Sequence, residues 1–378
     1  MPNIETIIRI QSGGGRTSPR KKSQPLDTKS VQKRIALIIT FIMIFVWVLS
    51  GVAEARESGE TYNASGVVNR TVSVDPTGMT EGFSAVIYDN TNGLPTSEAN
   101  AITETSDGFI WIGSYAGLIR YDGNTFERMD STTGISSIKC LYTDSRDRLW
   151  IGTNDNGVAV LERGEMRMWG KLEGMSSAHT RAITEDENGT IYVATTDGIM
   201  TIDPEYHLAK IEEEEIEHAN MRDLRMYENG VIYGTTDLGD IMTISDGKLL
   251  SYLSAEDNPQ QGVGAILPDP KDPENLYMET FDMEFHYVSY ADGKLTDIET
   301  INIEPLKYIK QLEYIDGKIW ICAGNGIGTL DENNNFTLLE TLPMNNNVGH
   351  VMTDYLGNLW FTSTRQGVMK VYQRTAAL

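Results

Sequence analysis

A unit of about 40 residues recurs seven times between residue 83 and the end of the chain. Each copy has an aromatic anchor within a short apolar run, and successive anchors are 39 to 44 residues apart. The anchors are Trp111, Trp150, Tyr192, Tyr233, Tyr277, Trp320 and Trp360. Self-similarity at this period is typical of repeat proteins, in which each unit packs only against its neighbours.

Within each unit the pattern is that of short antiparallel strands. An alternating run such as residues 101–104 leads into a dipeptide such as Asp107-Gly108, which tolerates positive φ and fits a tight hairpin. An apolar strand follows, then a second glycine turn and a third strand, and no stretch after residue 56 has helical periodicity. The sequence therefore predicts an all-β, seven-bladed β-propeller of four-stranded antiparallel blades.

The two ends of the repeat region predict how the ring closes. The last unit supplies only three strands, over residues 348–353, 358–363 and 367–372, whereas residues 83–88 form a strand-like run without a hairpin partner. Pairing the two removes two open sheet edges. We therefore expect this N-terminal strand to complete the last blade.

The part of the chain before the repeats divides into segments of different charge. Residues 1–34 contain eight Lys or Arg and two acids, residues 35–53 contain no charged residue, and the whole chain has a net charge of −23. An uncharged run of this length spans a bilayer as a helix, and its basic flank stays in the cytoplasm. We predict a basic cytoplasmic leader (1–34), a transmembrane anchor or signal helix (35–53), a linker (54–81) and an extracytoplasmic propeller (82–378).

Two alternatives to the membrane anchor remain open for residues 35–53. Ala53-Glu54-Ala55 offers the small residues that a signal peptidase needs, so cleavage near Ala55 would release the propeller. The segment is also compatible with a buried core helix. The acidic balance of the rest of the chain argues against a nucleic-acid partner, which requires a positive field.

The repeat motif resembles a known family. Gly93-Leu94-Pro95, followed by residues 106–118 (SDGFIWIGSYAGL), is similar to the two-component-regulator propeller repeat. The resemblance implies an extracytoplasmic ligand-sensing input module of a bacterial signalling protein, of the histidine kinase or diguanylate cyclase type. The fifth unit departs most from the pattern, because residues 268–273 lengthen its turn and Glu279 replaces the usual Gly or Ala.

The sequence offers no catalytic, metal or cofactor motif. The five histidines lack metal-ligand spacing, and no nucleophile elbow, Walker loop or zincin motif is present. We expect no catalytic residue, no metal and no cofactor in the chain as given.

Cys140 and Cys322 replace small residues of other units and are predicted to be buried thiols. No output domain is recognisable, which predicts a fragment of a longer protein or a separate signalling partner.

A candidate ligand site follows from one slot of the repeat, two residues before the apolar position of Ile102. We expect this slot at the mouth of the central channel, where the innermost strand of each unit begins. Around the ring it holds Asn100, Lys139, Arg181, Arg222, Gly264, Lys310 and Gly349. Four cations in an otherwise acidic region predict that the mouth of the channel binds an anion. Two alternatives remain open. Nearby acids such as Asp155 and Asp197 could neutralise the cations, or the slot could be an exposed edge at which residues vary freely.

Aromatic residues in nearby loops complete the predicted site. Tyr115 lies in the first unit, and Phe281 with Phe285 in the fifth. Aromatic platforms beside hydrogen-bond donors suit a small molecule or an oligosaccharide. The predicted ligand-binding residues are therefore Lys139, Arg181, Arg222, Lys310, Tyr115 and Phe281. Two other functions stay open, an exported polysaccharide lyase or hydrolase on a propeller scaffold and a scaffold for protein partners.

Overall fold

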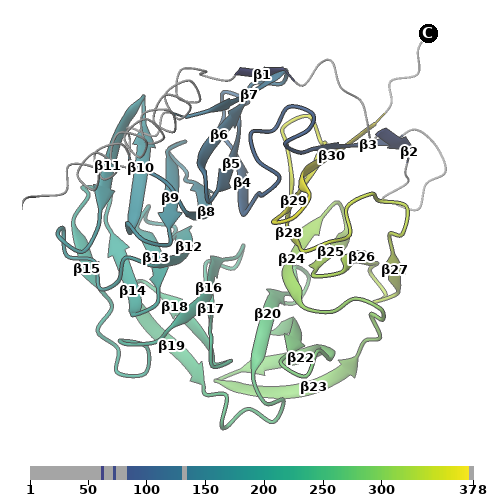
Figure 1. Cartoon of the computed structure of the whole chain (residues 1–378). Helices are drawn as coiled ribbons and strands as arrows, with labels where there is room; N and C mark the ends of the chain where they lie inside the picture. Colours follow the sequence, from purple (N-terminus) through teal and green to yellow (C-terminus); the bar gives the residue numbers. More distant parts are fainter. Residues whose placement is uncertain (1–60, 64–70, 74–82, 130–133, 374–378) are drawn as a thin grey trace, which may run out of the picture. The chain divides into compact units, whose positions relative to one another are not determined.

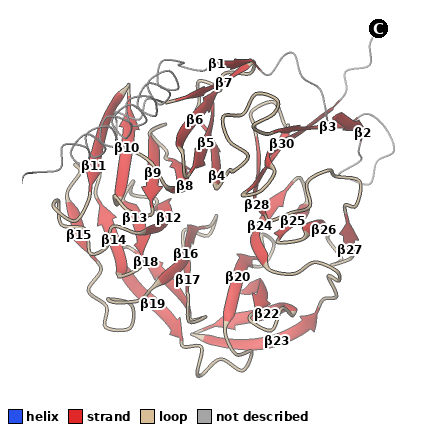
Figure 2. Ribbon diagram, in the orientation of Figure 1, coloured by secondary structure: helices blue, strands red, loops and turns tan. Residues whose placement is uncertain are grey.

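The computed structural model describes residues 61–63, 71–73, 83–129 and 134–373. These residues form seven antiparallel sheets arranged around a common axis, with β-strands and connecting loops and no helix in the described part (Figures 1 and 2). The predicted all-β, seven-bladed propeller is therefore confirmed. Among these residues there is no helix long and apolar enough to cross a membrane. The leader and the predicted anchor, residues 1–53, lie outside the described residues.

The blades have a common order, with the first strand of each nearest the axis (Figure 1). Blade 1 contains β4 (Ala101–Glu104), β5 (Ile110–Ser114), β6 (Gly117–Tyr121) and β7 (Thr125–Arg128). Blade 2 contains β8 (Ile138–Thr143), β9 (Leu149–Thr153), β10 (Val158–Glu162) and β11 (Glu165–Trp169). Blade 3 contains β12 (Thr180–Glu185), β13 (Ile191–Thr195), β14 (Gly198–Ile202) and β15 (Leu208–Lys210). Blade 4 contains β16 (Met221–Met226), β17 (Ile232–Thr236), β18 (Ile241–Ser245) and β19 (Lys248–Leu253).

The remaining blades follow the same order. Blade 5 contains β20 (Val263–Pro268), β21 (Asn275–Thr280), β22 (Phe285–Ala291) and β23 (Lys294–Thr300). Blade 6 contains β24 (Ile309–Ile315), β25 (Lys318–Ala323), β26 (Gly326–Leu330) and β27 (Phe336–Leu338). Blade 7 contains β28 (Val348–Thr353), β29 (Leu359–Ser363), β30 (Gly367–Gln373) and β3 (Phe83–Tyr88). Blade 5 thus keeps four strands despite its longer first turn.

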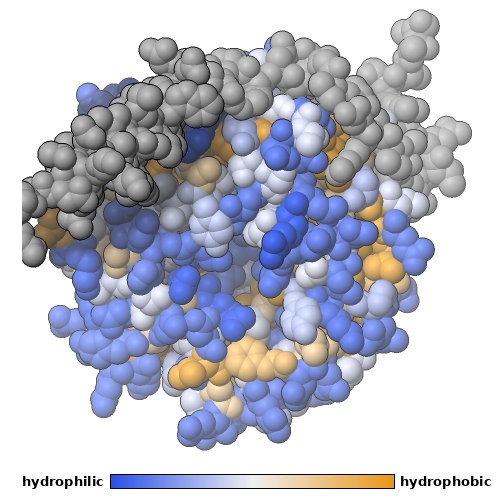
Figure 3. All heavy atoms as spheres, viewed as in Figure 1, coloured by the Kyte–Doolittle hydropathy of each residue, from blue (hydrophilic) through white to orange (hydrophobic). Residues whose placement is uncertain are grey.

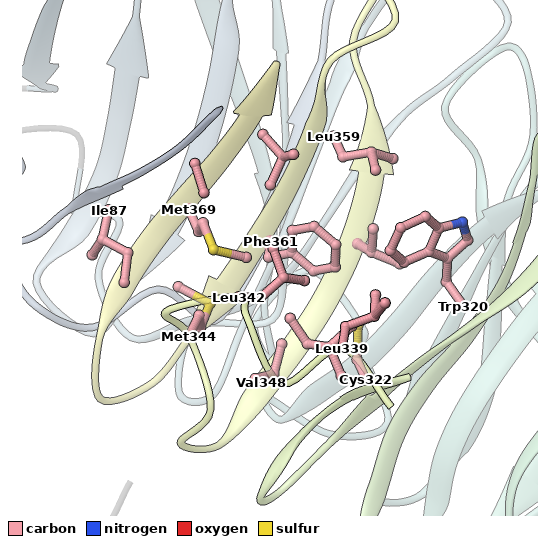
Figure 4. Packing of buried hydrophobic residues seen from close by; sticks show 14 residues of the cluster. Ile87, Trp320, Cys322, Leu339, Leu342, Met344, Val348, Leu359, Phe361 and Met369 are labelled. Carbon is pink, nitrogen blue, oxygen red and sulfur yellow. The ribbon is translucent and has the colours of Figure 1, made fainter. Parts of the chain in front are cut away.

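The hydrophobic core consists of seven clusters, and each is shared by two neighbouring blades. Figure 4 shows the cluster between blades 6 and 7, where Trp320 and Cys322 of β25 meet Phe361 of β29 and Met369 of β30. Blade faces bury apolar area only against the next blade, so stability propagates around the ring. Both cysteines are free thiols, Cys322 buried and Cys140 partly so, and burial raises the pKa of each.

The repeated Asp-to-aromatic spacing has a hydrogen-bonding cause. Trp150 Nε1 donates to Asp144 Oδ2 at 2.6 Å, and Trp360 Nε1 donates to Asp354 Oδ2 at 2.9 Å. In blade 2 the same carboxylate also accepts from Arg148 Nε at 2.6 Å, and that guanidinium is 2% exposed. In blades 2 and 7 the aspartate that begins the turn thereby satisfies the one polar atom of the buried indole, and in blade 1 Thr105 Oγ1 accepts from Trp111 Nε1 at 2.9 Å instead.

The N-terminal strand lies where the sequence placed it. β3 pairs antiparallel with β30, from Phe83 opposite Gln373 to Tyr88 opposite Val368. Blades 7 and 1 also meet through the Tyr355 amide, which donates to Glu104 Oε2 at 2.9 Å. The equivalent contact between blades 2 and 3 runs from the Ser145 amide to Glu185 at 2.7 Å. The interface between the last and first blades therefore uses a contact found elsewhere in the ring.

The segment predicted to be a linker contains strands that the sequence did not indicate. β1 (Thr61–Asn63) pairs with the outer edge of β7, and β2 (Thr71–Ser73) pairs with the outer edge of β3. Both strands lie within residues 54–81, the segment that the sequence analysis assigned to a linker. Strands of three residues carry too little alternation to be recognised by pattern.

Candidate ligand site at the axial rim

The seven slot residues lie at one level of the ring, where the innermost strands begin, and we call this set the axial rim. In blade 2, Ile138 is opposite Thr153 and Cys140 is opposite Gly152, so Lys139 is the extra residue of a β-bulge. The same register shift contains Arg181, Arg222, Gly264, Lys310 and Gly349 in blades 3 to 7. In blade 1, Asn100 immediately precedes β4.

The bulges explain why the side chains of the axial rim differ in direction from the rest of each strand. A bulged residue has no partner in the ladder, and the local kink changes the direction of its side chain. Lys139, Arg222 and Lys310 are exposed, and Arg181 is partly exposed. The structure therefore brings the four predicted cations to equivalent positions on four of the seven innermost strands.

The acids that were expected to neutralise these cations have other partners. Asp197 accepts a hydrogen bond from His218 Nδ1 at 2.8 Å, which lowers the pKa of Asp197, and Asp155 accepts one from Asn156. Only Arg222 of the four cations has an ion pair among the described residues, with 3.6 Å between its Nε and Asp237 Oδ1. Lys139, Arg181 and Lys310 have none within the same residues.

The two glycines of the axial rim face polar side chains from the second strand of their blades. A Cβ on Gly264 would lie 3.2 Å from Glu279 Oε2, and one on Gly349 would lie 3.2 Å from Thr362 Oγ1. Glu279 is 7% exposed, and its Oε1 accepts a hydrogen bond from the Ile309 amide at 2.9 Å. The sequence singled out Glu279 only as a departure from the repeat. The sequence alone does not show that Glu279 lies at the axial rim, because its proximity to Gly264 depends on the pairing of β20 with β21.

Glu279 lies between two rim cations. Burial raises the pKa of the Glu279 carboxyl, whereas the Ile309 amide and the charges of Lys310 and Arg222 act in the opposite direction. A buried carboxylate, which was not predicted, thus lies beside the cations of the axial rim.

An ion pair joins the innermost strands of two blades that are not adjacent. Arg225 of β16 in blade 4 pairs with Glu313 of β24 in blade 6, and its Nη1 donates to the Leu312 carbonyl at 3.2 Å. Blades 4 and 6 are not neighbours, so this side chain reaches past blade 5. His350 of β28 is also at the axis, where burial and the charges of Lys139 and Arg225 lower its pKa to about 4.

The predicted aromatic residues divide between surface and core. Tyr115, in the loop between β5 and β6, is 55% exposed, and Phe281, in the loop between β21 and β22, is 43% exposed. The prediction for Phe285 is wrong, because it begins β22 and is buried in the cluster between blades 5 and 6. Tyr308 and Leu238, which the sequence analysis did not select, are exposed in loops that precede β24 and β18.

Phe281 is held in place by its surroundings. A Cβ on Gly262 or Gly239 would come within 3.0 Å of its ring, so both glycines allow the aromatic group to approach the backbone closely. The guanidinium carbon of Arg222 lies 5.3 Å from the ring centroid, within the range of a cation–π contact. Hydrophobic residues gather on the viewed face near β17 and β20 (Figure 3). Blades 4 to 6 therefore carry cation, carboxylate and aromatic groups together.

Comparison with known proteins supports the repeat assignment. The sequence model of the family described as two component regulator propeller matches residues 93–116 and 134–155, in the first two units. No curated protein sequence matches the chain.

Solved structures share the fold at low identity. The extracellular domain of a putative hybrid two-component system from B. thetaiotaomicron is 17% identical, with a TM-score of 0.60 over 76% of this chain and 41% of that chain. A streptogramin B lyase is 15% identical, with a TM-score of 0.63 over 78% of this chain and 98% of that one. YCF48 bound to D1 peptide is 14% identical, with a TM-score of 0.60 over 81% of this chain and 100% of that chain. Identities this low show the fold alone. The chain is thus a seven-bladed propeller, and its residues 93–116 and 134–155 match the two component regulator propeller repeat.

Proposed function

We propose that the propeller is the extracytoplasmic ligand-sensing input module of a bacterial signalling protein. Its output would be a histidine kinase or a diguanylate cyclase, in a longer form of this chain or on a separate partner. Residues 35–53 would anchor it in the membrane with a single helix. The family repeats and the fold shared with an extracellular domain of a two-component system support this assignment.

The ligand we propose is an anionic, hydroxyl-rich oligosaccharide bound over the axial rim. The observation that carries this proposal is the set of three rim cations, Lys139, Arg181 and Lys310, without an ion pair among the described residues. Like charges around one axis repel one another and favour an anion between them. Tyr115 and Phe281 offer exposed rings for the apolar face of a sugar.

Calorimetric titration of the purified full chain with uronate-containing and sulphated oligosaccharides tests this function. Arg181→Ala and Lys139→Ala should each weaken binding by about 1.5–3 kcal/mol, the value of a hydrogen bond to a charged group. Both should also reduce the salt dependence. Lys248→Ala provides a matched control, because Lys248 is exposed on the outer strand β19.

Four outcomes would contradict the proposal. Unchanged affinity in both rim variants would exclude the axial rim as the site, and binding confined to neutral sugars would exclude anion recognition. Turnover of an oligosaccharide would instead favour the alternative of an exported propeller-fold polysaccharide lyase or hydrolase. A protein scaffold, the other alternative, would bind none of the sugars.

A further inference from the structure

Glu279 is a buried carboxylate at a position where the other six blades have no ionised group. The equivalent position, two residues after the aromatic anchor, holds small or neutral residues in the other six blades: Gly113, Gly152, Ala194, Thr235, Cys322 and Thr362. Burying an ionised carboxylate costs free energy that none of these residues incurs. A buried ionisable group that beside its structural contacts also faces charged residues is a candidate for a functional role.

The two oxygens of Glu279 have different surroundings. Oε1 accepts from the Ile309 amide at 2.9 Å, and the Tyr308 amide also donates to the carboxylate, so the segment that leads into β24 fixes its orientation. Oε2 lies over Gly264, where a side chain on that residue would begin. Glu279 therefore places a carboxylate from the second strand beside the rim position that four of the other blades fill with a bulged cation.

The chemistry of this arrangement discriminates among anions. Lys310 and Arg222 are the charge neighbours of Glu279 and attract an anionic group. A sulfate ion has only acceptor oxygens at neutral pH, so the carboxylate repels it. A sugar acid brings hydroxyl groups beside its carboxylate, and a hydroxyl donates a strong hydrogen bond to an ionised acceptor.

We propose that Glu279 is a ligand-binding residue that makes the axial rim select hydroxyl-bearing sugar acids over simple anions. Lys310 and Arg222 hold the acidic group of the ligand, and Glu279 Oε2 accepts from a neighbouring hydroxyl. Phe281, two residues further along the chain, packs against the sugar ring. This inference rests on the proposed function and names the ligand class of the same site.

Two variants of the full chain test the role of Glu279 in titrations with oligogalacturonate and with inorganic sulfate. Glu279→Gln keeps an acceptor for the Ile309 amide and removes the charge. Glu279→Thr introduces the residue that blades 4 and 7 already have at this position. We expect both variants to weaken oligogalacturonate binding by about tenfold or more, and to bind sulfate more tightly than the wild type.

A matched control separates a direct contact from a general charge effect. Asp282→Asn removes one negative charge from an exposed position of the neighbouring loop. It should move the two affinities in the same direction and by less than about twofold, since exposed charges interact weakly.

The outcomes distinguish this inference from the function on which it rests. If Glu279→Gln binds oligogalacturonate as tightly as the wild type or more tightly, the carboxylate only repels anions. The inference then falls while the proposed function stands. If the wild-type chain binds no acidic oligosaccharide, the proposed function fails and the inference fails with it.

Discussion

Truncating Ile87 to alanine tests whether β3 holds the ring together. Ile87 is 1% exposed and lies opposite Met369 in the ladder between β3 and β30. It belongs to the cluster between blades 6 and 7, where it lies beside Met369 (Figure 4). In every other blade the fourth strand follows the third strand directly along the chain. In blade 7 this strand comes from the other end of the repeat region, so its docking joins the two ends.

The size of the effect follows from the burial of the side chain. The substitution removes about three methyl or methylene groups, each worth ~0.8 kcal/mol when buried, and leaves a cavity in the cluster. We expect the free energy of unfolding to fall by about 2–4 kcal/mol. Leu250→Ala is the matched control, because Leu250 is 58% exposed on the outermost strand β19 and should cost less than ~0.5 kcal/mol.

Urea unfolding of the full chain, followed by tryptophan fluorescence and by circular dichroism, measures both variants. The midpoint should shift with an unchanged m-value if the native state alone is affected. A loss for Ile87→Ala as small as that for Leu250→Ala would show that β3 does not stabilise the ring. Deleting residues 83–88 should expose two sheet edges and cause aggregation, and a deletion variant as stable as the intact chain would refute the same reasoning.

Three further predictions follow from other parts of the structure. Asp144→Ala should lower the free energy of unfolding by about 3–5 kcal/mol, because it leaves the Arg148 guanidinium buried without its partner, and a loss below ~1 kcal/mol in thermal unfolding would contradict this. His350 is held neutral with a pKa of about 4, so the unfolded chain binds its proton first as the pH falls. Stability should therefore decrease between about pH 6.5 and pH 4, by more in the wild type than in His350→Gln. A reporter active only outside the membrane should work when fused after residue 80, and activity confined to the cytoplasm would exclude export.

Much of the fold was predictable because its signals are local. The seven anchors gave the number and order of the blades, and the strand predicted over residues 358–363 is observed as Leu359–Ser363. Alternation and turn dipeptides depend on residues within one hairpin, so they are legible in a single sequence. The same periodicity identified the seven positions of the axial rim, but it did not show that six of them lie at register shifts.

The composition of the site was decided by contacts between strands and blades. Glu279 fills the space left by Gly264, and Arg225 reaches past a whole blade to Glu313. Phe281 and Phe285 are four residues apart, yet one stays on the surface while the other enters the core. Repeat spacing fixes which strand a residue belongs to. The direction of its side chain depends on bulges and on neighbours 15 to 88 residues away, which only the packed ring brings together.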